Sequence, residues 1–164
     1  MADSCSDNVV NVVLAGLGGQ GVLKASDVLA DAAFAAGRDV KKSEIHGMSQ
    51  RGGSVTSDVR FGPTVLSPMV PAGRANYLVV IAPDQAENNR PLLAPDGVLL
   101  SADRIDPAAL PHPRSVNVAL MGLLSLYLDF PESAWQEALR RNFPDKLLEL
   151  NQQAFALGRR TRRP

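Results

Sequence analysis

The fold of this chain is decided by residues 9–21, which read VVNVVLAGLGGQG. Residues 8–15 are rich in β-branched side chains, and this predicts a strand that is covered on both faces. The glycines that follow have the spacing G-x-G-x-x-G at Gly16, Gly18 and Gly21. Apolar residues then recur at near-helical spacing over residues 20–36, so a helix should begin at the turn.

Strand and helix signals alternate along the rest of the chain. We expect further strands at residues 39–44, 54–61, 77–82, 98–101 and 115–118, and the mixed polarity of 54–61 predicts that it is half exposed. Helices are expected at residues 83–93, 119–128, 131–142 and 144–158. This order predicts an α/β fold of the Rossmann-like type, with a mostly parallel sheet flanked by helices and a C-terminal helical segment.

Length and composition limit the possible functions. The 164 residues are enough for a single domain over residues 1–164, with a disordered tail at 1–7 and a helical appendage at 131–164. The formal net charge is zero, which gives no general affinity for nucleic acid. No stretch reaches the roughly 18 apolar residues that span a membrane, and the polar N-terminus is unlike a signal peptide, so we expect a cytoplasmic protein.

The chain has a single cysteine, Cys5. One cysteine excludes a disulfide within the chain, and it also excludes an iron–sulfur or cysteine-based zinc site, because these need several thiolates. We therefore expect no metal site.

The first glycine-rich loop is a candidate anion site. Backbone N–H groups at a helix N-terminus point outward, and the helix dipole favours a bound anion such as a diphosphate. The residues expected to bind the cofactor are Gly16, Gly18, Gly19, Gln20 and Gly21. A purely structural alternative is that these glycines only let the helix pack closely on the strand.

The second glycine-rich loop, residues 43–53, holds an acid, an imidazole and a guanidinium between glycines. Glu44, His46 and Arg51 are the candidate catalytic residues: Arg51 could bind a carboxylate or phosphate with two hydrogen bonds, and His46 could act as acid or base near neutral pH. The structural alternative is an ion pair between Glu44 and Arg51 that pins the loop. Both loops follow predicted strands with one helix between them, so we expect them at the same end of the sheet, where α/β proteins place their sites.

The two motifs together, GLGGQGV at residues 16–22 and SEIHGMSQRGGSV at 43–55, resemble the γ-type subunit of 2-oxoacid:ferredoxin oxidoreductases. Within that family the similarity is strongest to the small (β) subunit of indolepyruvate ferredoxin oxidoreductase. It continues more weakly through residues 77–90, 115–122 and 142–158, and so covers most of the chain.

The resemblance implies a subunit that is inactive alone and binds no cofactor by itself. In this family a large partner carries thiamine diphosphate and the iron–sulfur clusters, electrons pass to ferredoxin, and the acyl group passes to coenzyme A. In relatives the γ-type domain lies against the thiamine domains and helps to enclose coenzyme A. Residues 16–21 would then be a candidate diphosphate contact, and residues 43–53 would reach toward the active site or the partner. The family's usual residues differ at Pro83, Asp84 and Ser101, so the 2-oxoacid stays open among indolepyruvate, another aryl pyruvate and an aryl glyoxylate.

Two rival functions stay open at this point. One is a stand-alone oxidoreductase that binds NAD(P) or FAD on the first loop, with Glu44 on the ribose, because Glu44 follows Gly21 by 23 residues. The other is a binding module with a vestigial site.

Overall fold

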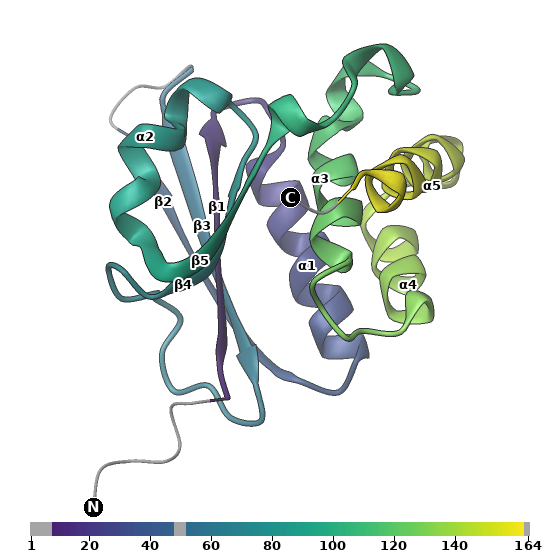
Figure 1. Cartoon of the computed structure of the whole chain (residues 1–164). Coiled ribbons are helices and arrows are strands. Elements are labelled where there is room, and N and C mark those ends of the chain that lie inside the picture. Colours follow the sequence, from purple (N-terminus) through teal and green to yellow (C-terminus); the bar gives the residue numbers. More distant parts are fainter. Residues whose placement is uncertain (1–7, 48–51, 163–164) are drawn as a thin grey trace, which may run out of the picture.

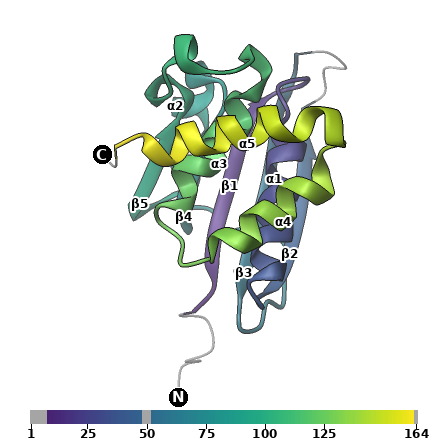
Figure 2. The ribbon, with the colours of Figure 1, turned by 90° about the vertical axis from the view of Figure 1, so that its right-hand side faces the viewer.

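A computed structural model describes residues 8–47 and 52–162. Its five-stranded sheet has the order β2-β3-β1-β4-β5 (Figures 1 and 2). The strands are β1 Val10–Leu17, β2 Asp39–His46, β3 Ser54–Gly62, β4 Ala75–Val80 and β5 Leu93–Ser101. The α-helices are α1 Val22–Ala35, α2 Ala86–Asn89, α3 Val116–Ser125, α4 Glu132–Asn142 and α5 Asp145–Arg160.

The sheet is mixed, so the expectation of a mostly parallel sheet is wrong, although the α/β class is confirmed. Strand β1 pairs parallel with β4, and β4 parallel with β5, but β3 is antiparallel to both β1 and β2. The physical reason is the length of the 47–53 connection. A parallel crossover needs about a dozen residues or more, so a connection this short must return β3 as the second strand of a hairpin.

Strand β3 is also buried rather than half exposed. It lies inside the sheet, and Ser57, Val59 and Phe61 on it are at most 3% exposed. Asp58 is buried too, and its Oδ2 accepts a hydrogen bond from the backbone N–H of Val70 at 2.9 Å. Burial raises the pKa of Asp58 above its usual value, and the Val70 hydrogen bond offsets this only in part. Asp58 is therefore covered by the 63–74 connection, while Ser57 lies on the same face of β3 as Val59 and Phe61, which pack in the main core.

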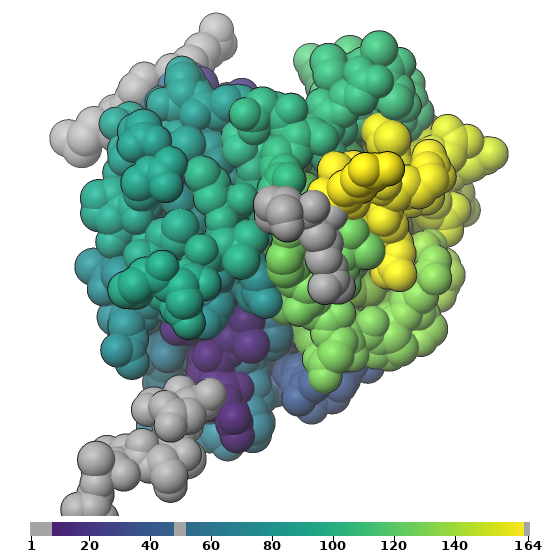
Figure 3. All heavy atoms as spheres, in the orientation of Figure 1, coloured from purple at the N-terminus to yellow at the C-terminus, as the bar shows by residue number. Residues whose placement is uncertain are grey.

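The helices form two unequal layers. Helices α1, α3, α4 and α5 lie on one face of the sheet and the short α2 lies on the other (Figures 1 and 2). Helix α4 packs on α1, and α5 packs on α3. The aromatic residues Phe130, Trp135 and Phe155 join these helices to the main core, with ring centroids 5.7 and 5.4 Å apart along the row. In Figure 3 teal atoms, the colour of β4, α2 and β5, form much of the surface on the side of α2.

Helices α3 and α5 cross at Gly122 and Gly158. A Cβ atom on Gly122 would overlap the carbonyl oxygen of Phe155, and one on Gly158 would overlap that of Ala119. Only glycine allows the two backbones to approach this closely. The crossing thus sets where α5 lies along α3.

Two further expectations about single elements are wrong. Residues 115–118 are not a strand: Pro113–Ser115 is a 3-10 turn, and α3 begins at Val116, because a short Ser-Val-Asn-Val stretch before the apolar run at 118–121 fits the start of a buried helix as well as a strand. Residues 83–93 form not one helix but three short pieces, Pro83–Gln85, α2 and Arg90–Leu92, since Pro91 interrupts the pattern. Strand β5 begins earlier than predicted, at Leu93.

The proposed division of the chain stays a prediction. Residues 1–7, predicted as a tail, lie outside the described residues. Residues 132–160 do form helices, and they contribute Trp135, Leu139 and Phe155 to the same core as the sheet. Within residues 8–47 and 52–162, no helix has the length and apolar character needed to cross a membrane.

Candidate functional site

The turn between β1 and α1 is stabilised by the side chain of Gln20 and by two glycines in the left-handed conformation. Gly19 and Gly21 have φ of 86° and 83°, a conformation that favours glycine. The backbone N–H of Leu17 donates to Gln20 Oε1 at 2.8 Å, and the N–H of Gln20 donates to the carbonyl of Leu17 at 3.2 Å. The loop is thereby fixed in shape, with the first turn of α1 behind it.

A residue of α3 supports this turn from the side. Asn117 is 5% exposed, and its Nδ2 donates to the carbonyl oxygen of Gly21 at 3.1 Å. A Cβ on Gly21 would overlap the same Asn117 amide. Asn117 was not among the residues singled out from the sequence, because its signal depends on a contact 96 residues along the chain.

A cavity of about 400 Å³ opens beside the turn, at the carboxyl ends of β1 and β4. Gly19, Gln20 and Gly21 form one wall, and Ile81 and Asn117 line it. Two cationic side chains border it, Lys24 from α1 and Arg114 from the segment before α3. The Arg114 guanidinium has no hydrogen bond or ion pair with any residue in the described ranges, and the backbone N–H of Arg114 donates to His112 Nδ1. The cavity therefore combines backbone donors with free positive charge.

This cavity also lies where the topology of the sheet changes direction. From β1 the chain runs through α1 toward β2 and β3 on one side, and β4 and β5 lie on the other side of β1. Open α/β sheets bind ligands in the crevice at such a switch point.

The second loop lies at the same end of the sheet as the first, as predicted. Leu17 at the end of β1 pairs with Ser54, and His46 at the end of β2 pairs with Val55. The backbone N–H of Gly18 donates to the carbonyl of Gly53 at 2.9 Å, so the two loops touch directly. Arg51 and the neighbouring Gln50 lie outside the described residues.

The α1-facing side of β2 carries a row of alternating charge. Lys42 donates a hydrogen bond to Asp27 of α1 and another to Glu44 Oε1 at 3.0 Å. Glu44 Oε2 lies 4.0 Å from His46 Nε2. Partial burial lowers the pKa of Lys42, but the two hydrogen bonds outweigh it, and the pKa is raised above its usual value. Lys42 thus holds the Glu44 carboxylate beside the imidazole.

His46 also lines a second cavity, of about 480 Å³, on the other side of the glycine turn. Its remaining walls are glycine or aliphatic, among them Gly18, Gly19, Val22 and Val55. Gly19 and Gly21 belong to both cavities, so the turn separates a cationic cavity from an apolar one. The structure therefore brings His46 close to the predicted glycines Gly18, Gly19 and Gly21. Glu44 contacts His46 but does not line this cavity. Gly16 lies beneath the turn, against Val22 and Ile81.

The position of Glu44 disfavours a dinucleotide site. In such sites the ribose-binding acid ends the strand next to β1. Here β3 lies between β1 and β2, so Glu44 is two strands away from the glycine turn, and Lys42 already holds it. A spacing of about 20 residues was the only sequence signal for that role, and spacing alone does not reveal strand order.

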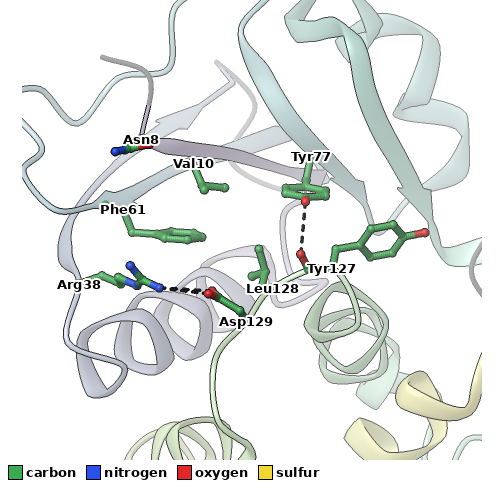
Figure 4. Close-up of a pocket in the computed structure, with 9 residues that line it drawn as sticks. Asn8, Val10, Arg38, Phe61, Tyr77, Tyr127, Leu128 and Asp129 are labelled. Atoms are coloured by element: carbon green, nitrogen blue, oxygen red, sulfur yellow. Dashed lines mark hydrogen bonds and ion pairs between the residues drawn. The ribbon is translucent and has the colours of Figure 1, made fainter. Parts of the chain in front are cut away.

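The opposite end of the sheet carries a smaller cavity, of about 200 Å³ (Figure 4). Arg38 and Asp129 close one side of it with an ion pair at 3.3 Å, and the Tyr77 hydroxyl donates to the carbonyl of Tyr127 at 3.4 Å. It lies away from the glycine turn of residues 16–21 and from the N-terminus of α1. In the described residues no group of three or more histidine, cysteine or acidic side chains is placed to hold a metal ion.

Comparison with known proteins gives a consistent result. The family model "Pyruvate ferredoxin/flavodoxin oxidoreductase" matches residues 11–112. The chain is 33% identical to the indolepyruvate oxidoreductase subunit IorB of Thermococcus kodakarensis, over 90% of this chain and 93% of that protein. It is 30% identical to the IorB subunit of Archaeoglobus fulgidus, over 91% and 93% of the two chains.

Solved structures share the fold at lower sequence identity. The γ subunit of a keto/oxoacid ferredoxin oxidoreductase from Geobacter sulfurreducens superimposes with a TM-score of 0.78 at 21% identity, covering 93% of this chain and 95% of that chain. A 2-oxoglutarate:ferredoxin oxidoreductase from Magnetococcus marinus, with 2-oxoglutarate, coenzyme A and succinyl-CoA bound, gives 0.75 at 20% identity, covering 93% of this chain and 30% of that chain. On the family match and the IorB identities, the chain belongs to the pyruvate ferredoxin/flavodoxin oxidoreductase family and is a homologue of the IorB subunits.

Proposed function

We propose that this chain is the small subunit of a thiamine diphosphate-dependent 2-oxoacid ferredoxin oxidoreductase, and that it forms part of the coenzyme A site. The family membership and the names of the IorB relatives support the first part. The observation that carries the second part is the cationic cavity beside the glycine turn. Indolepyruvate or another aryl pyruvate is the 2-oxoacid that fits the relatives best.

The cavity has the features that a diphosphate requires. Its glycine wall precedes α1, a helix of 14 residues, so unpaired N–H groups and the positive end of the helix dipole face an incoming anion. Lys24 and Arg114 add two positive charges, and the planar Arg114 guanidinium can bind phosphate oxygens in pairs. The diphosphate of coenzyme A is the anion we assign to Gly18, Gly19, Gln20 and Gly21, with Gly16 allowing the turn to sit close to the sheet.

The second loop is the part that we propose reaches the active centre or the partner subunit. His46 lies beside the apolar cavity, and Glu44 can orient its imidazole. Arg51, on the same loop, is proposed to hold a carboxylate or phosphate. Thiamine diphosphate and the iron–sulfur clusters belong, in this proposal, to a large partner subunit, with ferredoxin as the electron acceptor and the cytoplasm as the location.

The test is assembly followed by measurement of coenzyme A affinity. Co-expression with a large subunit of the same family should give a complex that oxidises an aryl pyruvate with coenzyme A, and the separated small subunit should give no turnover. Arg114→Glu should raise the KM for coenzyme A by about tenfold or more, because it replaces a phosphate partner with a like charge. Arg74→Glu, at the opposite end of β4, is the matched control. Equal KM values for the two variants would contradict the coenzyme A assignment.

A further inference from the structure

A third cavity adjoins the cationic one on the side away from His46. It measures about 290 Å³ and shares Arg114 and Asn117 with the cationic cavity. Its far wall consists of Phe143, between α4 and α5, and of Leu147 and Leu150 from the first turns of α5. The two cavities are therefore neighbours on either side of Arg114 and Asn117.

The walls of this third cavity suit a flat ring with polar edges. Phe143, Leu147 and Leu150 supply apolar surface, and Leu147 is 42% exposed, which is high for a leucine. Asn151 is 5% exposed and lines the same cavity. Its Nδ2 donates to the carbonyl of Leu147 at 2.9 Å, and its Oδ1 has no hydrogen bond within the described ranges, so an acceptor remains for a ligand.

Lys24 links the two cavities. Its Nζ donates to the carbonyl of Asn142 at 3.3 Å and lies 5.9 Å from the centroid of the Phe143 ring. Lys24 lines the cationic cavity and Phe143 lines the third one, so this contact joins their walls. A ligand with a charged middle and a flat end would meet basic groups first and apolar walls next.

Three cavities thus follow one another, from the helix layer to the carboxyl edge of the sheet: the third cavity, the cationic cavity and the apolar cavity at His46. The first pair shares Arg114 and Asn117, and the second pair shares Gly19 and Gly21. In coenzyme A the diphosphate lies between the adenosine and the pantetheine arm. The cationic cavity likewise lies between the third cavity and the apolar cavity.

We infer that the cavity formed by Phe143, Leu147, Leu150 and Asn151 receives the adenine end of coenzyme A. The pantetheine arm then leaves the cationic cavity across the glycine turn toward His46. This inference rests on the proposed function, since it takes coenzyme A as the ligand. The opposite direction is disfavoured because the arm would end against α5, away from the second loop.

A charge placed on the wall of the third cavity tests the orientation. In the assembled complex, Leu147→Glu should raise the Kd of coenzyme A and of 3′,5′-ADP by about tenfold or more, because it sets a carboxylate beside the nucleotide. The Kd of 4′-phosphopantetheine should not change. The matched control is Leu66→Glu, which changes a 90% exposed leucine on the 63–74 connection and should leave all three affinities unchanged.

The outcomes separate this inference from the function on which it rests. If Leu147→Glu leaves coenzyme A binding unchanged while Arg114→Glu weakens it, the adenine assignment is wrong and the coenzyme A site stands. If neither variant changes binding, both are wrong. A loss confined to 4′-phosphopantetheine would show the reverse orientation. Photolabelling of the wild-type complex with 8-azido-ADP should modify residues 143–151, and labelling elsewhere would overturn the inference whatever the variant does to folding.

Discussion

The backbone N–H of Gly18 donates to the carbonyl oxygen of Gly53 at 2.9 Å. This bond joins two loops that are 35 residues apart in the sequence, and a Cβ on Gly18 would lie 3.6 Å from the N atom of Gly52. The glycine turn and the His46 loop consequently form one continuous edge, with the cationic cavity on one side and the apolar cavity on the other.

The close contact between Asn117 and Gly21 should be detectable as a change in the free energy of unfolding when Gly21 is substituted. Gly21→Ala should lower the free energy of unfolding by about 2–4 kcal/mol, because alanine is strained at this positive φ and its Cβ would also overlap the Asn117 amide. Gly37→Ala is the matched control: its φ is 82°, but nothing lies within 4 Å of its Cβ, so it should cost only about 1 kcal/mol. Urea unfolding measures both. Equal losses would show that the Asn117 contact does not matter.

Burial of Asp58 should make stability depend on pH. The folded state raises the pKa of this carboxyl, so it favours the protonated form, and stability falls as pH rises from the unfolded value of 3.8 through the higher folded value. Asp58→Asn cannot ionise, and Asn can still accept the Val70 hydrogen bond. The stability of this variant relative to wild type should therefore increase as the pH rises from about 4 toward neutral.

Urea midpoints at several pH values check this prediction. Asp96→Asn, at an exposed position, should follow the wild-type curve throughout. A constant difference between Asp58→Asn and wild type across the range would show that Asp58 does not titrate differently in the folded state.

The imidazole of His46 should affect turnover rather than coenzyme A affinity. In the assembled complex, His46→Ala should lower kcat by about tenfold or more, in keeping with the size of general acid–base effects, and leave the Kd of 3′,5′-ADP unchanged. Glu44→Gln should have a smaller effect in the same direction, because it changes only the group behind the ring. Lys41→Ala, on the opposite face of β2, is the control. If the His46→Ala complex has a normal kcat, His46 takes no part in turnover and the second loop has only a structural role.

Close approach of α3 and α5 should make Gly158 intolerant of any side chain. Gly158→Ala places a methyl group on the carbonyl of Ala119, and we expect a loss of about 3 kcal/mol or more, since backbone cannot move aside as a side chain can. Gln153→Ala, at an exposed position on the same helix, should change stability by less than about 0.5 kcal/mol. Thermal unfolding followed by circular dichroism distinguishes the two.

The sequence predicted the parts of this molecule that depend on neighbouring residues. The β1–turn–α1 unit is local, and its glycines and apolar spacing identified it. The common end of the two loops followed from strand, helix and strand in succession. Strand direction was missed at β3, although the short 47–53 connection contained the information, because a hairpin and a crossover differ in the length that they need.

Residues that act through distant contacts could not be found in this way. Arg114 and Asn117 reach the glycine turn only after α3 packs against α1, and neither belongs to a motif. The ribose-binding role considered for Glu44 is disfavoured for a related reason. The number of residues between Gly21 and Glu44 does not reveal that β3 lies between β1 and β2. His46 was identified from the loop composition, but its apolar cavity depends on Val22 and Val55.

The crossing of Gly122 and Gly158 has a consequence for the far end of α5. To slide by one turn, about 5.4 Å, α5 would have to bring a residue with a side chain to the point where only hydrogen fits. Gradual displacement of this helix is thereby blocked, and Leu147, Leu150 and Asn151 keep one position relative to Arg114. A ligand arriving at this edge would meet walls that are already in place, and would lose little free energy in ordering them.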